Sequence, residues 1–194
     1  MLGYYTYLSL IFKPLFKKII SLSLKDGVLL FNHGYLHKCD EFNSTDYSNQ
    51  YISIKKTQDL VKKHFNITLH SFGAPCNKPS DITLNVIADN FPEINMIFLY
   101  SDNQHLTHAT FYNTRCDYEV WVKRQYKNGV IAKVDFEIFK ENYLSKHENN
   151  ESLVLQGHPF MWGVKSWIEF RRVLLYLKEQ DNYNLLTPTQ IMES

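Results

Sequence analysis

The alternation of short apolar runs with helical patterns is the feature that most constrains the fold of this chain. Four apolar runs are typical of buried strands: 27–33 (GVLLFNH), 67–75 (ITLHSFGAP), 95–101 (NMIFLYS) and 152–158 (SLVLQGH). Apolar residues spaced three and four apart predict helices at residues 46–65, 81–91, 136–147 and 166–180. Strands that alternate with helices through short connections predict an α/β fold built mostly on parallel strands.

Two further strands are predicted at residues 118–122 (YEVWV) and 184–188 (NLLTP). The N-cap of the helix over 46–65 is expected at Ser44, Thr45 or Asp46. No internal repeat, low-complexity tract or interdomain linker interrupts the sequence. We therefore expect a single domain over residues 1–194.

Charge and hydropathy exclude two classes of partner. The formal net charge is +1 with acidic and basic residues mixed, so no basic surface for nucleic acid is indicated. The apolar N-terminal stretch over 4–24 contains Lys13, Lys17 and Lys18, and it is too short for a membrane-spanning helix. We expect it to form a core-packing helix, with an interfacial amphipathic helix as the alternative, and we expect no stable membrane insertion.

The three cysteines give no disulfide framework. Cys39, Cys76 and Cys116 are widely spaced and odd in number, and they do not have the CxxC spacing of a zinc site. No basic segment precedes the N-terminal apolar stretch, so a signal peptide is not indicated. A reducing compartment and a cytoplasmic location are the expectation.

Chemically capable groups follow three of the predicted strands. His33 ends the strand 27–33, and Gly34 is suited to a turn that would bring His37 back beside it. Two imidazoles so placed are typical ligands of a divalent cation, although two surface histidines would give the same spacing. The other endings are Gly73-Ala74-Pro75 and His158-Pro159. Ligands collect at the carboxyl ends of parallel strands, so these endings are candidates for one site.

Three sequence motifs in this order resemble those of the polysaccharide deacetylases, carbohydrate esterase family four. FNHGYLH (31–37) resembles the HxxxH metal motif, and FGAPCN (72–77) resembles the loop that forms one wall of the groove. LVLQGHPFMW (153–162), followed by a long helix, resembles the C-terminal strand motif. The resemblance covers the chain from about Gly27 onward. It implies a distorted or incomplete (β/α) barrel of the polysaccharide deacetylase type.

The resemblance also implies a reaction and its site residues. His33 and His37 would hold a divalent metal, Zn²⁺ being the first choice, and His158 would be the catalytic general acid. The residues implied in substrate binding are Pro75, Asn77, Leu155 and Tyr35. The implied function is a metal-dependent hydrolase that deacetylates N-acetylated sugars of surface polysaccharide or lipopolysaccharide.

The paired aspartates of the family's first motif have no counterpart in this chain. Asp26 is the only aspartate before His33, and a strand of seven residues places it roughly 23 Å from that histidine. Either an N-terminal strand segment is missing from the sequence, or the chain is a divergent member with an incomplete metal site. The second reading includes a catalytically inactive carbohydrate-binding protein, and the first a fragment of a larger deacetylase.

Other carboxylates are candidates for a third metal ligand. Asp40 and Glu41 lie just beyond His37, and Asp102 follows the strand 95–101. Solvated surface acids are the alternative for all three. Phe72 stands where the family's loop motif commonly starts with an arginine that orients the base. The absence of that arginine fits the absence of the base, since each would otherwise be left without its partner.

Overall fold

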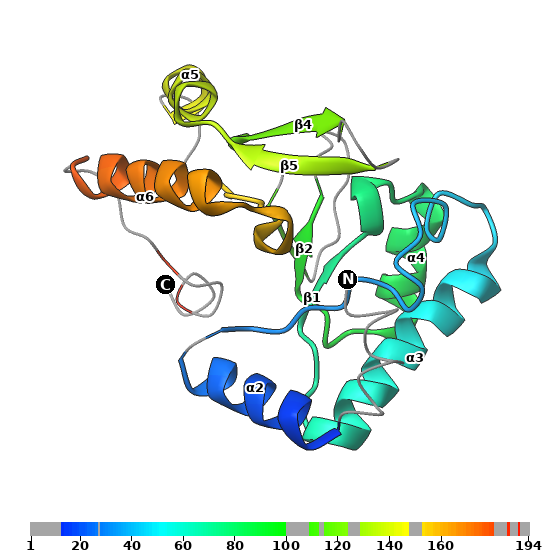
Figure 1. Ribbon diagram of the computed structural model, residues 1–194. Coiled ribbons are helices and arrows are strands. Elements are labelled where there is room, and N and C mark those ends of the chain that lie inside the picture. The colour runs from blue at the N-terminus through cyan, green and yellow to red at the C-terminus, as the bar shows by residue number, and fades with distance from the viewer. Residues whose placement is uncertain are drawn as a thin grey trace. The chain divides into compact units, whose positions relative to one another are not determined.

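The chain gathers into two compact units, Met1–Asn113 and Thr114–Ser194, and each is described here by itself. The computed structural model describes these residues: 13–26, 28–99, 109–112, 115–123, 129–147, 153–180, 186 and 190. The fold is mixed α/β, as the alternating pattern predicts (Figure 1). Within the described residues the strands form a three-stranded sheet and a two-stranded sheet. The barrel and the single domain stay predictions.

The first unit is built on a parallel sheet of order β1-β2-β3. Its strands are β1 (Ser71–Gly73), β2 (Met96–Phe98) and β3 (Thr110–Tyr112). Asn32 adds one parallel bridge to Phe72 on the free side of β1. The sequence element 27–33 is therefore paired at Asn32 alone among its described residues.

Helices connect these strands and cover the sheet. Helix α3 (Tyr47–Phe65) joins Asn32 to β1, and α4 (Asp81–Asn90) joins β1 to β2. The two helices lie side by side in Figure 1. Asp46 caps α3 as predicted, accepting a hydrogen bond from the Asn49 backbone N–H at 3.0 Å. A further helix, α2 (Lys13–Lys25), precedes Asn32.

The core of the first unit lies between α3, α4 and the sheet. Its buried side chains are mostly aromatic or branched: Phe42, Ile54, Phe72, Ala74, Leu84, Val86, Ile87, Phe91, Ile94, Ile97 and Leu99. Phe42 and Phe72 pack edge to face, with ring centroids 5.2 Å apart. Phe72, which stands where the resembled motif has an arginine, is therefore a core residue.

The second unit consists of a β-hairpin packed on helices. Strands β4 (Glu119–Lys123) and β5 (Val130–Val134) pair antiparallel, which confirms the strand predicted at 118–122. Helices α5 (Phe136–Lys146) and α6 (Val164–Lys178) confirm the two C-terminal helical patterns. Both helices lie beside the hairpin in Figure 1. The buried core comprises Cys116, Tyr118, Ala132, Val134, Phe139, Tyr143, Trp162, Val173 and Leu177.

The prediction of a buried strand over 152–158 is wrong in the part of it that the structure describes. Only Val154 is bridged, to Arg115, and the segment is half-buried. The backbone N–H of His158, which a strand would place in a ladder, is donated instead to the Glu119 carboxylate at 2.7 Å. The short 3₁₀ helix η3 (Pro159–Met161) then follows. The strand predicted at 184–188 lies outside the described residues except for Leu186, which is not in a strand.

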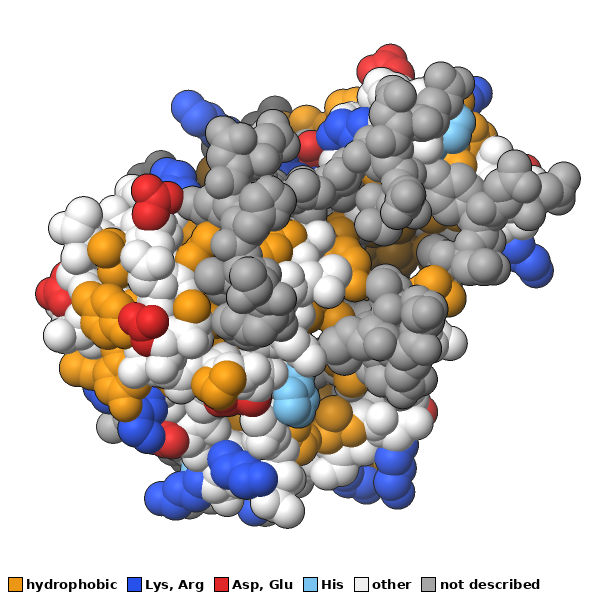
Figure 2. All heavy atoms as spheres, turned by 180° about the vertical axis from the view of Figure 1, so that it is seen from behind, with side chains coloured by type: hydrophobic (Ala, Val, Ile, Leu, Met, Phe, Trp, Pro, Cys, Tyr) orange, Lys and Arg blue, Asp and Glu red, His pale blue; other side chains and the backbone are white. Residues whose placement is uncertain are grey.

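Some large apolar side chains remain at the surface. On α6 they are Val164, Trp167, Ile168, Leu174 and Leu175. Figure 2 shows hydrophobic side chains open to solvent among charged and polar ones on the face it draws. None of the described helices is both long and apolar enough to cross a membrane.

Candidate functional site

The two histidines of FNHGYLH lie together at the edge of the first unit's sheet. Their rings are T-shaped, with centroids 4.8 Å apart. Asn32 fixes the start of the segment, because its backbone exchanges hydrogen bonds with Ser71 and Gly73 of β1. The next residue, His33, is thereby held beside the end of β1. The juxtaposition of His33 and His37 is as the sequence predicts.

His33 is a neutral imidazole whose Nδ1 atom takes part in a hydrogen bond. Its Nδ1 atom lies 2.6 Å from the Gly73 carbonyl oxygen, so Nδ1 carries the proton and donates it. Burial lowers the pKa of His33 to about 4, against the opposite effect of the hydrogen bond to Gly73. The Nε2 atom therefore holds a lone pair at neutral pH. Histidines that bind metals almost always donate their other ring N–H in this way.

Glu41 organises the loop that carries the two histidines. Its carboxylate accepts the backbone N–H groups of Tyr35 at 2.7 Å, Leu36 at 3.0 Å and Lys38 at 3.3 Å. The Ser53 hydroxyl of α3 also donates to this carboxylate. The side chain therefore ties the loop to the helix behind it. Both oxygens are used in these bonds, so the structure gives Glu41 a framework position rather than that of a ligand.

Two residues of the loop adopt left-handed backbone conformations. Gly34 has φ of 74°, and a Cβ there would come within 2.7 Å of the Phe42 ring and 2.8 Å of the Glu41 carboxylate. His37 has φ of 55°, which is uncommon for a residue with a side chain. Asn32 supports the turn from below: it is fully buried, and its Oδ1 accepts the Gly34 N–H at 3.1 Å. The turn between the two histidines therefore depends on glycine at position 34, and His37 itself holds an uncommon backbone conformation.

A disulfide joins the histidine loop to the FGAPCN loop. Cys39 and Cys76 are bonded, with their Cα atoms 5.1 Å apart. This corrects the expectation from cysteine spacing that no disulfide would form, because two residues far apart in sequence meet where the loops leave neighbouring strands. Pro75 is buried beside this bond, and Asn77 is half-buried with φ of 53°. Both predicted substrate-binding residues therefore lie in the loop that the disulfide ties to His37.

The two imidazoles fit as metal ligands, and the described residues add no third. Nowhere in the part of the chain that the structure describes do three His, Cys, Asp or Glu side chains gather closely enough to hold an ion. Asp40 is exposed, and Asp102 lies outside the described residues. Tyr35 is half-buried, and its ring lies 5.1 Å from the Lys56 ammonium. The sequence predicts the pair of histidines, but it does not predict the Glu41 contacts and the Cys39–Cys76 disulfide around that pair.

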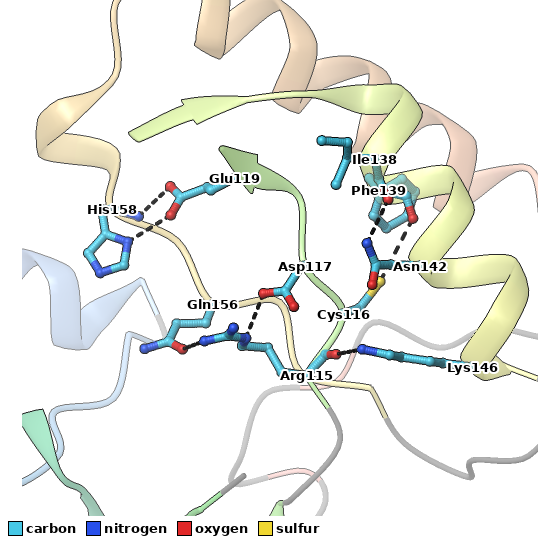
Figure 3. A network of polar contacts seen from close by, with 10 residues as sticks. All are labelled: Arg115, Cys116, Asp117, Glu119, Ile138, Phe139, Asn142, Lys146, Gln156 and His158. Carbon is cyan, nitrogen blue, oxygen red and sulfur yellow. Dashed lines mark hydrogen bonds and ion pairs between the residues drawn. The ribbon is translucent and has the colours of Figure 1, made fainter. Parts of the chain in front are cut away.

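The second unit holds His158 in a polar arrangement of its own (Figure 3). The Nδ1 atom of His158 lies 2.7 Å from Glu119 Oε2, and Oε1 accepts the backbone N–H of the same histidine at 2.7 Å. Oε1 also accepts the indole N–H of Trp162 at 2.5 Å. Glu119 therefore fixes both the backbone and the ring of His158. This leaves the Nε2 atom as the nitrogen suited to exchange a proton with a bound molecule.

Glu119 is ionised at neutral pH despite its position. Burial opposes its ionisation and is the largest influence, but the hydrogen bonds from His158 and Trp162 together outweigh it, so its pKa is lowered. Its side chain is 5% exposed, against 32% for that of His158. A buried carboxylate therefore fixes the orientation of a partly exposed imidazole.

Aromatic rings border the exposed side of His158. Trp121 packs against it with centroids 4.9 Å apart and is 52% exposed, and Phe160 lies 6.2 Å away and is 56% exposed. Open aromatic faces of this kind can stack on sugar rings. Leu155 packs against the core of the second unit. Gly157 allows close approach, since a Cβ there would overlap the Tyr118 hydroxyl.

Other polar contacts in Figure 3 hold the segments that lead to His158. Arg115 pairs with Asp117 at 2.6 Å and donates to Gln156 at 3.3 Å. The Lys146 ammonium of α5 donates to the Arg115 carbonyl at 2.7 Å. These contacts connect the bridged segment at Arg115 to the residues just before His158. The Glu119–His158 pair could not be read from the sequence, in which the two residues lie 39 positions apart.

Comparisons with protein-family models, with curated proteins and with solved structures find no match to this chain. The resemblance to polysaccharide deacetylases therefore rests on its three sequence motifs.

Proposed function

We propose that the chain is a deacetylase-like hydrolase that acts on N-acetylated sugars of surface polysaccharide or lipopolysaccharide. The observation that carries the proposal is the His33–His37 pair, in which His33 donates one ring nitrogen to the Gly73 carbonyl and keeps a lone pair on the other. This arrangement is typical of imidazoles that bind a divalent cation.

In this proposal His33 and His37 are two ligands of a divalent metal such as Zn²⁺. When bound, the ion supplies Lewis-acid polarisation of the acetyl carbonyl. The proposal names these two ligands only, because no described carboxylate gathers with them. The disulfide and Glu41 hold the loop in the geometry that brings the two imidazoles together.

His158 is proposed as the general acid. Cleavage of the amide bond transfers the acetyl group to water and leaves an amine that must take up a proton. Protonated His158 donates that proton from Nε2, while its Nδ1–H remains bonded to Glu119. Trp121 and Phe160 offer aromatic faces for the sugar ring. Leu155 is proposed to contribute to the acetyl-methyl pocket. Pro75, Asn77 and Tyr35 are proposed as further substrate-binding residues.

Acetate release from N-acetylated oligosaccharides in the presence of Zn²⁺ or Co²⁺ tests this function. We expect wild type to release acetate, and we expect the His158→Gln variant to do so at least about 100-fold more slowly. The matched control is His70→Gln, because His70 is exposed and its ring Nδ1 atom lies 3.0 Å from the Glu93 carbonyl oxygen.

Calorimetry with Zn²⁺ alone tests the ligand assignment. We expect about one ion per chain for wild type and a loss of that uptake in the His33→Gln/His37→Gln double variant. Equal metal uptake by wild type and the double variant would show that the pair is not the site.

The second candidate function is that of a carbohydrate-binding protein without turnover. It is favoured by the donor set, which consists of two imidazoles. Among the described residues no carboxylate joins the pair, and a hydrolase of this kind also needs a base. Binding of N-acetylated glycans without acetate release, at any metal concentration, would support this function over the first. The Trp121→Ala variant would then lower glycan affinity, since it removes an exposed stacking face.

A further inference from the structure

We propose that the Cys39–Cys76 disulfide is a site of thiol–disulfide exchange whose redox state sets the geometry of the His33–His37 pair. The proposal deepens the proposed function of this pair. It stands on three features of the first unit: the position of the bond, the exposure of its two cysteines, and the backbone conformations on either side of it.

The bond lies between the two loops that approach the histidine pair. Cys39 is two residues after His37, and Cys76 is three residues after Gly73, whose carbonyl accepts the proton of His33. The disulfide therefore closes a covalent loop over residues 39–76. This loop contains Gly73, which accepts the proton of His33, and Glu41, whose carboxylate accepts the amides just before His37. Any change in the distance between these loops is transmitted first to His37, because His33 is held separately by the sheet at Asn32.

Residues with left-handed backbone conformations flank the disulfide on both sides. His37, Cys76 and Asn77 have φ of 55°, 56° and 53°. For residues with a side chain this conformation is less favourable than the right-handed one, and asparagine tolerates it best. Such a geometry persists only where surrounding contacts enforce it. Opening the disulfide removes one of these contacts, so His37 gains the freedom to relax and to turn its ring away from His33.

Both sulfur-bearing residues are exposed, so a reductant can reach them. The partner is a dithiol, either a small molecule or a protein with two neighbouring thiols. Its thiolate attacks one sulfur of the pair and forms a mixed disulfide, and the other cysteine leaves as a thiolate that takes up a proton. The second thiol of the partner then attacks the mixed disulfide and releases the second cysteine. The partner is oxidised to its own disulfide, and the protein gains two electrons and two protons.

Hydrogen–deuterium exchange on the metal-free full-length chain tests the switch directly. The backbone N–H groups of Tyr35 and Leu36 are bonded to the Glu41 carboxylate in the oxidised protein. After reduction with dithiothreitol and alkylation of the freed thiols, we expect exchange at these amides to rise by about tenfold or more. Exchange in α4 should stay unchanged, because its buried residues belong to the core.

Two variants separate the bond from general effects of reductant. The Cys39→Ser/Cys76→Ser variant should show the faster exchange with or without dithiothreitol. The Cys116→Ser variant removes the buried free thiol of the second unit and should respond to reductant as wild type does. Unchanged exchange at Tyr35 and Leu36 on reduction would overturn the proposal. So would global unfolding on reduction, since the bond would then be a structural crosslink rather than a local switch.

Zn²⁺ calorimetry supplies a second readout that distinguishes the switch from the proposed function. We expect Zn²⁺ affinity to be at least about tenfold weaker in the Cys39→Ser/Cys76→Ser variant than in the oxidised wild type. Failure of oxidised wild type to bind Zn²⁺ would count against the metal site alone, because the exchange experiment needs no metal. Equal affinity in the two proteins would overturn the coupling between the bond and the pair.

Discussion

Glu119 holds His158 at two points, accepting the backbone N–H at Oε1 and contacting the ring Nδ1 at Oε2, each at 2.7 Å. This double contact orients the imidazole and places a buried negative charge against it. In the proposed reaction this orientation leaves the Nε2 atom to donate a proton to the leaving amine. Glu119 is thus a positioning residue that acts through His158.

The Glu119→Gln variant removes this charge while it keeps a similar shape. We expect the rate of acetate release to fall by about 10–100-fold with little change in glycan affinity. Acetate-release kinetics and glycan binding of the variant measure both quantities.

Asp117→Asn is the matched control for this prediction. Asp117 is also a carboxylate of the second unit, but it pairs with Arg115 and its side chain is 42% exposed. Its substitution should leave the rate of acetate release unchanged. A rate that falls equally in both variants would mean that general electrostatics, rather than the contact with His158, governs the rate.

The pKa of His33 predicts a loss of stability in mild acid. The native pKa is about 4, below the ordinary value of 6.5, so the unfolded chain binds a proton in this interval and the native chain does not. The neutral state of this residue therefore costs no stability above pH 6.5, and the chain loses stability as the pH falls from 6.5 towards 4. We expect the free energy of unfolding to fall by about 3 kcal/mol over this interval.

Urea unfolding of metal-free protein between pH 7 and pH 4 measures this loss. The His33→Gln variant should have a shallower dependence on pH than wild type. His70→Gln, which alters an exposed histidine, should retain the wild-type dependence. Equal slopes in wild type and His33→Gln would contradict the buried, neutral state of this ring.

Gly34 is expected to resist substitution by alanine. The φ of 74° disfavours any side chain, and the added Cβ would lie 2.7 Å from the buried Phe42 ring. We expect Gly34→Ala to lower the free energy of unfolding by about 2–4 kcal/mol. Gly163→Ala is the control, because a Cβ there meets nothing within 4 Å. A thermal or urea unfolding curve that places Gly34→Ala within about 0.5 kcal/mol of that control would be inconsistent with the loop geometry.

The three thiols are expected to differ sharply in reactivity. In the oxidised native protein no cysteine should react with a thiol reagent, because Cys39 and Cys76 are bonded and Cys116 is buried. Burial raises the pKa of Cys116 to about 11, so its thiolate is scarce at neutral pH. After reduction two thiols should react at once, and the third only on unfolding. Two thiols that titrate in the untreated native protein would rule out the disulfide.

Loss of the disulfide should also lower global stability. The bond joins residues 37 positions apart, and closure of a loop of this length restricts the unfolded chain by about 4 kcal/mol. We expect Cys39→Ser/Cys76→Ser to lower the free energy of unfolding by about 2–4 kcal/mol and to remain folded. Urea unfolding with and without reductant measures this difference, and wild type in reductant should match the variant.

The helices were predictable from sequence because each carries its own local signals. The spacing of apolar residues placed α3 and α4 to within a residue or two, and Asp46 was among the caps expected for α3. The strands were less predictable, since an apolar run becomes a strand only where a neighbour supplies hydrogen bonds. Around Asn32 and Val154 such a neighbour is present for a single bridge each.

Of the residues of the candidate site, only the histidines could be predicted from the sequence, because their chemistry is distinctive. His33 and His37 are close in sequence and flank a glycine, so their proximity could be inferred from spacing. The contacts of Glu41, the bond between Cys39 and Cys76, and the pairing of Glu119 with His158 all depend on the path of the folded chain. Odd cysteine number favoured free thiols, and only the meeting of two loops shows which pair is close enough to bond.

The Glu41 carboxylate gives the histidine loop a property that spacing alone could not suggest. The amides of Tyr35, Leu36 and Lys38 form a small anion receptor, and the chain supplies the anion from its own side chain. A tethered anion has a high effective concentration at any protein dilution, and soluble anions compete with it poorly. The frame of the two histidines therefore needs no ion from solution to assemble.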